Sequence, residues 1–494
     1  MTDIYIEKLN EVHLRVYSDD FGLESELTDF FTFEYPGAKF TPQYKARLWD
    51  GKIRLYDSIR KTLYVGLISY VEAFADQHNH TINYINEVIT KDDIQFSDVI
   101  GFIDSLDLRS KGQSISVRDY QLDSIHSSLC NKRGVLLSPT GSGKSLVIYI
   151  LSRWHLLHNR KVLIITPTTS LVEQMYSDFD DYSSADNWRV RDHCQKLYSG
   201  FPKHFQSNIL TTTWQSIYKL PKQWFDQFDV VIGDEAHQFK AKSLTVIMEK
   251  MTNVAYRLGT TGSLDDKKVH RLVLEGIFGK VYRVTTTKQL QDNGQLAGLQ
   301  ITSIVLKHTE STRVQCNKAD YQTEIEFLVQ NQKRNTFIRN LALRCKGNTL
   351  VLFQFVEKHG VVLYDMIQSR TEDRNIYLIH GNIDVDRRED IRRALTDETN
   401  AIVVASVGTT STGINIPSIE NIIFASPTKS IIRVLQSIGR GLRLNSGKTH
   451  CNLFDLTDDM QWKSWKNHTL KHGSERLKLY MAENFSVQMA EVSL

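Results

Sequence analysis

The segment Ser138-Pro139-Thr140-Gly141-Ser142-Gly143-Lys144-Ser145 decides the fold of this chain. A short apolar run, residues 134–137 (GVLL), precedes it, and a helical apolar run, residues 146–151 (LVIYIL), follows it. This strand–loop–helix order is that of a phosphate-binding loop, in which small residues let backbone N–H groups close on phosphates and the helix N-terminus adds positive potential. Ser138 stands where the general pattern has its first glycine. The context still predicts a nucleotide site on an α/β sheet.

Each residue type in this loop has an expected role in binding ATP. Lys144 is expected to reach the β- and γ-phosphates, and the hydroxyl of Ser145 to bind Mg²⁺. The small residues whose backbone would surround the phosphates are Thr140, Gly141, Ser142 and Gly143.

A pair of acids follows a second apolar run. Residues 228–233 (FDVVIG) lead directly into Asp234-Glu235-Ala236-His237. ATP hydrolysis needs two acids at such a strand end, and we expect Asp234 to hold Mg²⁺ and Glu235 to polarise the attacking water. An acidic quartet alone is most often a solvated loop, but downstream of a phosphate-binding loop it indicates an ATP hydrolase.

Short apolar runs alternate with amphipathic helical stretches from about residue 112 onward. A first series comprises residues 134–137, 161–165, 208–210 and 230–232, and a second comprises 349–353, 375–379, 401–405 and 421–424. Such alternation predicts parallel sheets flanked by helices. We therefore expect two tandem α/β domains, residues 112–290 and 291–494, after a small N-terminal α+β domain of residues 1–111.

The N-terminal block is acidic overall, but basic and aromatic residues gather between Lys39 and Lys61. The pair Asp50-Gly51 stands between residues 44–49 (YKARLW) and 52–56 (KIRLY), which predicts a β-hairpin. Its cations would contact phosphates, and Tyr44, Trp49 or Tyr56 would stack on an exposed base. Equally, the aromatic residues could simply form the core of a small domain. The candidate nucleic-acid contacts are Lys45, Arg47, Trp49 and Arg54.

Composition narrows the class of protein. At 494 residues the chain is too long for one hydrophobic core. A net charge of +3 is too small to imply nucleic acid by itself, so binding must come from local patches. The sequence shows neither an apolar run of membrane-spanning length nor a signal peptide at its start, and its five cysteines are scattered. We expect a cytoplasmic protein with reduced cysteines, no membrane association and no protein-bound transition metal.

Together these motifs resemble the superfamily 2 helicases over residues 112–460, and the resemblance implies two RecA-like domains. Residues 118–121 (RDYQ) resemble the family's adenine-reading element, with Arg118 and Gln121 at the nucleotide. Residues 165–174 and 210–216 look like two strand-end motifs that contact the phosphodiester backbone through hydroxyls and N–H groups. Residues 259–263 (GTTGS) resemble the motif that couples ATP to nucleic acid. The residues implied are Pro167, Thr168 and Thr212 for nucleic acid, and Thr261 and Ser263 for coupling.

The second α/β domain carries the remaining motifs of this family. Residues 378–381 (LIHG) and 403–417 resemble elements that imply Gly381 and Thr412 at nucleic acid and Gly413 at the nucleotide. Asn415 stands where many relatives have Asp. Residues 436–443 (QSIGRGLR) match the motif whose arginines reach ATP, where an Arg on the γ-phosphate accelerates transfer about 10³–10⁵-fold. The implied catalytic residues are Gln436, Arg440 and Arg443.

The resemblance is greatest to phage helicases of DNA recombination and repair, and it extends through the N-terminal block. It implies ATP-dependent unwinding and branch migration of Holliday junctions, displacement loops, R-loops and stalled forks. Branched or duplex DNA, and RNA–DNA hybrids, are the expected substrates of a monomer, with recombination or single-strand-binding proteins as partners. Two alternatives stay open: an RNA helicase, and a translocase subunit of a larger complex. We predict that the tail beyond residue 460 forms a basic helix that packs its apolar side on the second α/β domain.

Overall fold

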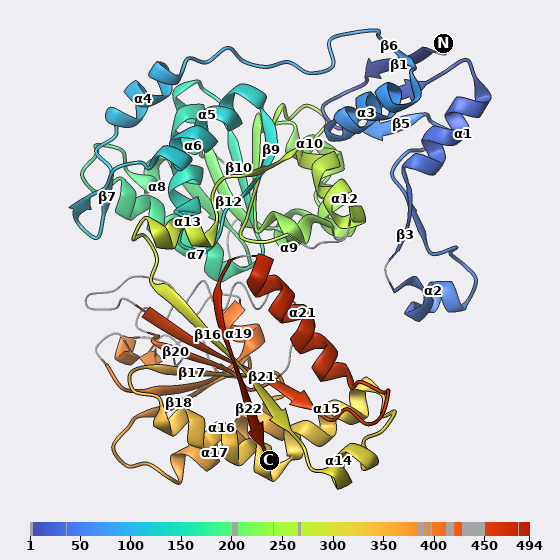
Figure 1. Cartoon of the computed structure of the whole chain (residues 1–494). Coiled ribbons are helices and arrows are strands. Elements are labelled where there is room, and N and C mark those ends of the chain that lie inside the picture. The colour runs from blue at the N-terminus through green and yellow to red at the C-terminus, as the bar shows by residue number, and fades with distance from the viewer. Residues whose placement is uncertain are drawn as a thin grey trace. The chain divides into compact units, whose positions relative to one another are not determined.

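The computed structural model describes residues 3–35, 37–199, 206–240, 242–264, 268–383, 387, 390–391, 393–395, 398–411, 419–426, 450–482 and 484–494. The chain divides into two compact units. The first contains Met1–Ser138 and Gly143–Val284, and the second contains Thr285–Leu494 with Pro139–Ser142. The predicted fold class is confirmed: two parallel-sheet domains flanked by helices, plus a small N-terminal domain (Figure 1). The predicted limits at residues 111 and 290 stay a prediction.

The N-terminal domain is a four-stranded sheet with two covering helices. Its order is β5 (Thr62–Tyr64), β2 (His13–Tyr17), β1 (Asp3–Lys8), β6 (Thr81–Tyr84), with β1 and β6 parallel and the other pairs antiparallel. Alternate side chains of β1 and β2 face α1 (Phe21–Phe30) and α3 (Ile68–His78) in one apolar core. Helix α1 begins after Asp20, whose Oδ1 accepts a hydrogen bond from Gly22 N at 2.8 Å.

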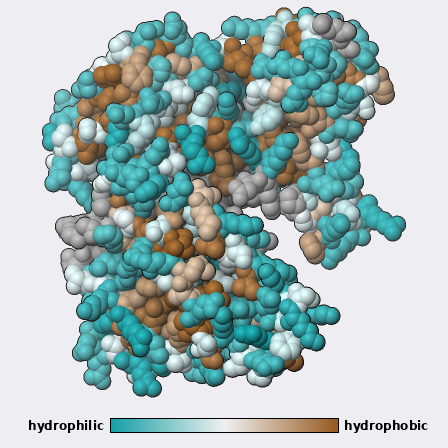
Figure 2. Space-filling view, in the orientation of Figure 1, coloured by the Kyte–Doolittle hydropathy of each residue, from teal (hydrophilic) through white to brown (hydrophobic). Residues whose placement is uncertain are grey.

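The expected hairpin around Asp50-Gly51 is wrong. Strand β4 (Lys52–Arg54) pairs antiparallel with β3 (Thr32–Glu34), and the intervening chain forms η1 (Ala38–Phe40) and α2 (Pro42–Lys45). Thr41 caps α2 by accepting from Tyr44 N, and Pro42 occupies its first turn, so helix-start signals outweigh the turn signal. The lobe formed by residues 32–54 is mainly hydrophilic, with a small apolar spot at its edge (Figure 2).

A seven-stranded parallel sheet forms the centre of the first unit. Its order is β11 (Cys194–Leu197), β12 (Ile209–Thr213), β10 (Val162–Thr166), β13 (Val230–Asp234), β14 (Tyr256–Thr261), β9 (Arg133–Leu137) and β15 (Val281–Arg283). Alternate residues of β10 enter two separate cores. One core holds α5 (Asp119–Asn131), α6 (Lys144–Leu157) and α7 (Thr169–Tyr182), and the other holds α11 (Lys242–Lys250) and α12 (Lys268–Phe278).

The second unit contains another seven-stranded parallel sheet. Its order is β18 (Ile376–Ile379), β19 (Ile402–Ser406), β17 (Thr349–Phe353), β20 (Asn421–Phe424), β21 (His450–Asp459), β16 (Gly298–Lys307) and β22 (Ser486–Ser493). Helices α16 (Gln332–Arg344) and α17 (Val361–Gln368) pack on it in one core. The tail differs from expectation in two ways: its helix, α21 (His468–Ala482), begins later, and β22 extends the sheet. Among the described helices none is both long and apolar enough to cross a bilayer.

Candidate ATP site and nucleic-acid contacts

The phosphate-binding loop leaves β9 and enters α6 as the sequence predicts. Gly141 (φ 87°) and Gly143 (φ 82°) both adopt the left-handed region, which only glycine enters without strain. Gly143 is the N-cap of α6, so Lys144 opens the helix. The Lys144 Nζ donates to the Ser138 carbonyl oxygen at 3.0 Å, which keeps the ammonium group beside the loop. A helix N-terminus that follows such a loop offers positive potential to a phosphate group.

Gln121 lies against this loop although it is distant in sequence. Its side chain is 3% exposed, and its Oε1 accepts from Arg118 N at 2.9 Å. A Cβ atom added to Gly143 would lie 2.3 Å from the Gln121 Nε2. The Arg118 guanidinium donates to the Tyr120 hydroxyl at 2.8 Å. The structure therefore brings the predicted adenine-reading element and the predicted phosphate loop together.

The two acids of the quartet stand at the carboxyl end of β13. Burial, and then the negative charge of Glu235, raise the pKa of Asp234 to about 6. A hydrogen bond from Thr260 at 2.8 Å and the positive charge of Lys144 both act to lower the pKa of Asp234. Such a pair suits a hard divalent cation, because carboxylate oxygens are its preferred ligands and its charge would stabilise both anions. Ser145, half-buried in the first turn of α6, adds a hydroxyl oxygen of the same kind.

Thr261 connects the phosphate loop to the acidic quartet. Strand β14 lies between β13 and β9, so its carboxyl end reaches both elements. The Thr261 carbonyl oxygen accepts from Ser138 N at 2.9 Å, and its hydroxyl lies 3.0 Å from His237 Nδ1. The same hydroxyl donates to the Ser263 carbonyl oxygen at 2.9 Å. This geometry suits the predicted coupling role of Thr261 and Ser263.

Sequence reasoning gave no role to His237 or Thr260. His237 Nδ1 lies 3.2 Å from Glu235 Oε2, so the imidazole lies between the Glu235 carboxylate and the Thr261 hydroxyl. The signal for His237 was present, because it is the fourth residue of the quartet. The signal for Thr260 was partial, because it lies within the motif of residues 259–263 but only sheet pairing places it beside Asp234.

The strand-end candidates differ in how they present their side chains. Pro167 and Thr168 are half-buried between β10 and α7, and Thr168 caps α7 by accepting from Leu171 N. Thr212 is fully buried, and its hydroxyl donates to the Leu197 carbonyl oxygen at 2.6 Å. The expected hydroxyl contact is therefore wrong for Thr212, since its hydroxyl serves the sheet.

Only part of the second-domain motifs can be placed. Gly381 follows β18, and an added Cβ there would meet nothing within 4 Å. The remaining predicted residues lie outside the described part of the chain; they are Thr412, Gly413, Gln436, Arg440 and Arg443.

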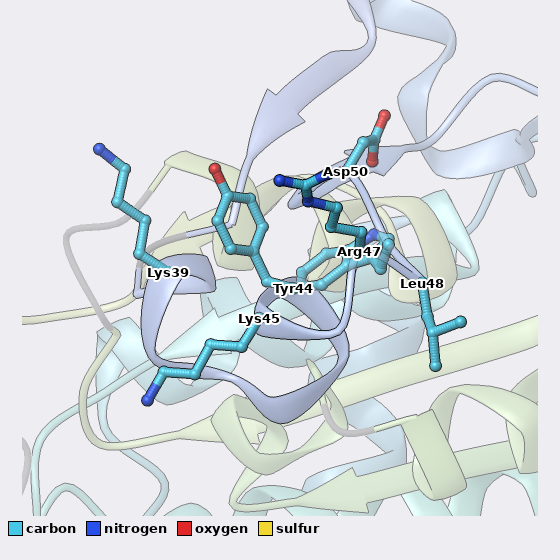
Figure 3. A pocket seen from close by; sticks show the side chains of 7 residues that line it. Lys39, Tyr44, Lys45, Arg47, Leu48 and Asp50 are labelled. Atoms are coloured by element: carbon cyan, nitrogen blue, oxygen red, sulfur yellow. The ribbon is translucent and has the colours of Figure 1, made fainter.

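The N-terminal candidates separate into surface and core residues. Lys45, Arg47 and Arg54 are exposed, and Figure 3 shows Lys45 extending outward near Arg47. Trp49 is half-buried, and its Nε1 donates to the Lys52 carbonyl oxygen at 2.9 Å. Tyr56 is 2% exposed, and its hydroxyl donates to the Val16 carbonyl oxygen at 2.8 Å. Stacking of Tyr56 on a base is therefore wrong, because that ring belongs to the core.

Comparison with known proteins defines the class. Residues 114–266 match the family model described as "Type III restriction enzyme, res subunit", and residues 332–445 match "Helicase conserved C-terminal domain". Residues 3–85 match "DNA helicase UvsW, N-terminal". The chain belongs to the superfamily 2 helicases and is an ATP-hydrolysing enzyme of that class.

Within this class the chain is similar to UvsW of bacteriophage T4 along its whole length. It is 32% identical over 510 residues to the phage T4 "ATP-dependent DNA helicase uvsW", covering 100% of both chains. The crystal structure of T4 UvsW superposes with a TM-score of 0.53 at 29% identity over 99% of both chains. The chain is also 22% identical to "DNA 3'-5' translocase XPB2" of Sulfurisphaera tokodaii, covering 69% of this chain and 82% of that one.

Proposed function

We propose that this chain is an ATP-dependent DNA helicase that unwinds and branch-migrates branched DNA, including Holliday junctions, displacement loops, R-loops and stalled forks. The observation that carries the proposal is the 32% identity to a DNA helicase over the full length of both chains, including the N-terminal domain. The candidate ATP site supports it, because Thr261 is hydrogen-bonded to Ser138 of the loop and to His237 of the acidic quartet, and Thr260 is hydrogen-bonded to Asp234.

The residues of this chain divide the work of ATP hydrolysis. Lys144 neutralises phosphate charge, Glu235 accepts a proton from the attacking water, and Gln121 holds the adenine edge. Ser145 and Asp234 would hold Mg²⁺, which supplies charge neutralisation at the β- and γ-phosphates. Thr261 would transmit the change at the γ-phosphate through Ser263 to nucleic acid. Gln436, Arg440 and Arg443 complete the proposal from the second domain.

Contacts to DNA are proposed on both units. Pro167, Thr168 and Gly381 would position the phosphodiester backbone, and Thr412 would do so from outside the described residues. Lys45, Arg47 and Arg54 would bind phosphates at the branch, which makes affinity fall with salt. We propose that a monomer suffices and that RNA–DNA hybrids are also opened.

The test is steady-state ATP hydrolysis with single-stranded DNA, duplex DNA, a four-way DNA junction and structured RNA. Unwinding of labelled branched DNA is scored in the same samples. The proposal expects strong stimulation by DNA together with disassembly of the junction. Stimulation by RNA alone would overturn the DNA assignment and leave the ATP-driven motor in place.

A translocase subunit of a larger complex is the second candidate. The match of residues 114–266 to the res subunit of Type III restriction enzymes favours it. Such a subunit would hydrolyse ATP on DNA without separating strands by itself. The unwinding measurement above therefore decides between the two functions.

A further inference from the structure

The segment of residues 37–54, between β3 and the end of β4, presents two large apolar side chains to solvent. Phe40, the last residue of η1, is 83% exposed, and Leu48, just beyond α2, is 81% exposed. The neighbouring rings of Trp49 and Tyr35, by contrast, are held by contacts within the protein. Trp49 donates to the Lys52 carbonyl oxygen and lies 5.5 Å from the Tyr35 ring. The fold therefore leaves Phe40 and Leu48 available to a partner.

The segment that carries these two side chains is rich in positive charge. Residues 37–54 contain five basic side chains and one acid, Asp50. That carboxylate pairs with Arg54, whose hydrogen bond lowers the pKa of Asp50 and keeps it ionised. A hollow of about 590 Å³ lies here, and its lining includes Lys39, Lys45 and Leu48. Figure 3 shows Lys39 and Lys45 extending outward, while Leu48 points away from Tyr44 and Arg47. This charge complements a polyanion.

The lobe of residues 32–54 contacts helix α12 of the first α/β domain. Lys268 Nζ lies 5.4 Å from the centre of the Phe33 ring, and the Tyr35 ring lies 6.5 Å from His270. Helix α12 follows the coupling motif, which ends at Ser263. A lobe held in this way would move with the sheet that carries Asp234 and Thr261.

We propose that residues 37–54 form a strand-separating wedge, in which Phe40 and Leu48 pack against the outermost base pair at a DNA branch point while Lys39, Lys45 and Arg47 bind the flanking phosphates. The proposal rests on the proposed helicase function. A branch point exposes the flat face of a base pair, and apolar side chains can replace the lost stacking there without reading sequence. Phosphate contacts hold the wedge in place.

The test compares the double variant Phe40→Ala/Leu48→Ala with Phe21→Ala. Phe21 is a matched control because it is 85% exposed in the same domain but lies beside the acids Asp19 and Asp20. Unwinding of a four-way DNA junction and ATP hydrolysis with single-stranded DNA are measured on the full chain. The ratio of unwinding to hydrolysis is expected to fall about ten-fold or more in the double variant, from the loss of base stacking. It is expected to stay at the wild-type value in Phe21→Ala, and Phe40→Trp should retain it.

A second readout reports the base pair itself. A junction carrying 2-aminopurine at the branch point should brighten when wild-type protein binds without ATP, because the base unstacks, and should stay dim with the double variant. The wedge is overturned if the double variant unwinds and brightens the junction like wild type, or if Phe21→Ala loses as much. If wild-type protein opens no DNA at all, the helicase proposal itself fails and the wedge with it.

Discussion

At the scale of single residues, the ATP site depends on backbone conformations that few side chains allow. Gly143 has a φ of 82° and leaves room for the Gln121 amide. Glu235 has a φ of 50°, in the left-handed region that favours glycine. Strained residues of this kind gather at functional sites, where surrounding contacts hold them.

Gly143→Ala is expected to impair ATP binding. The new Cβ would lie 2.3 Å from the Gln121 Nε2 and would displace the amide that we propose holds the adenine edge. Gly112→Ala is the control, since Gly112 also has a positive φ of 76° but an added Cβ there meets nothing within 4 Å. Affinity for a fluorescent ATP analogue should fall at least about ten-fold, or about 1.4 kcal/mol, in the first variant only. Unchanged affinity in Gly143→Ala, or an equal loss in Gly112→Ala, would contradict this role of the Gln121 contact.

Glu235→Gln is expected to retain ATP and nucleic acid while abolishing turnover. The amide keeps the shape of the side chain but accepts no proton, so hydrolysis should fall about 10²–10⁴-fold. Single-turnover hydrolysis and filter binding of labelled ATP measure the two effects separately. Normal turnover in this variant would disprove the assignment of Glu235.

At the scale of elements, α12 joins the N-terminal domain to the motor sheet. Glu275 is 2% exposed and accepts from the Tyr70 hydroxyl and from Arg271 Nε. Leu272 enters the N-terminal core. Gly66 touches this helix so closely that an added Cβ would lie 1.9 Å from the Glu275 carbonyl oxygen. The two domains of the first unit therefore share one packed boundary.

Gly66→Ala is expected to break this boundary, because backbone on both sides prevents relief of the clash. A loss of about 1–3 kcal/mol is typical of overpacking of this kind. Gly101→Ala provides the control: it lies in α4 (Phe96–Asp104) with nothing within 4 Å of an added Cβ, and it should stabilise by about 0.5–1 kcal/mol. Thermal and urea unfolding measure both, and similar shifts in the two variants would contradict the packing argument.

The C-terminal helix is anchored by a buried ion pair. Arg476 in α21 is 2% exposed, donates to both oxygens of Asp455, and shares that carboxylate with Tyr480. Arg476→Met should cost about 3–5 kcal/mol, because the buried Asp455 side chain would lose its partner. Arg60→Met removes an exposed pair with Asp57 and should change stability by less than about 1 kcal/mol. Urea unfolding separates these outcomes, and an equal effect would disprove the anchoring role.

At the scale of the whole molecule, each unit contains a buried histidine that stays neutral. His155 in α6 and His359 beside α17 are both 0% exposed. Burial, followed by the positive charge of Arg160, lowers the pKa of His155 to about 3. Burial, followed by Arg334, lowers the pKa of His359 to about 3.

Stability is therefore expected to fall as pH falls below about 6.5. The unfolded chain takes up a proton at each histidine near pH 6.5, whereas the folded chain takes it up only near pH 3. Each histidine therefore lowers the free energy of unfolding by about 1.4 kcal/mol for every pH unit between about 6.5 and about 3. Above about pH 6.5 it has no effect on that free energy. The variants His155→Gln and His359→Gln should each flatten the pH dependence of Tm between pH 7.5 and 5.0. Curves parallel to wild type would contradict the assignment.

Local features of the chain predicted where the candidate ATP-site residues of the first unit lie relative to its strands. The loop around Lys144 and the acids Asp234 and Glu235 each adjoin an apolar run, so their strand-end positions follow from a contiguous sequence pattern. The wrong predictions concern longer-range choices. The pair Asp50-Gly51 is typical of a turn, but β4 pairs with β3 instead of with residues 44–49. Tyr56 is buried in the core of the N-terminal domain.

The sequence by itself determined the class of chemistry, because a phosphate loop and paired acids work only as short contiguous motifs that local spacing specifies. Tertiary structure alone decided which distant residues support them. Sheet order places Thr261 between Ser138 and His237, and helix packing presses Gln121 against Gly143. It also decided that β22 pairs with β16 and that Phe40 stays in solvent. These outcomes depend on competition among pairings and burial across the whole chain, which no local pattern encodes.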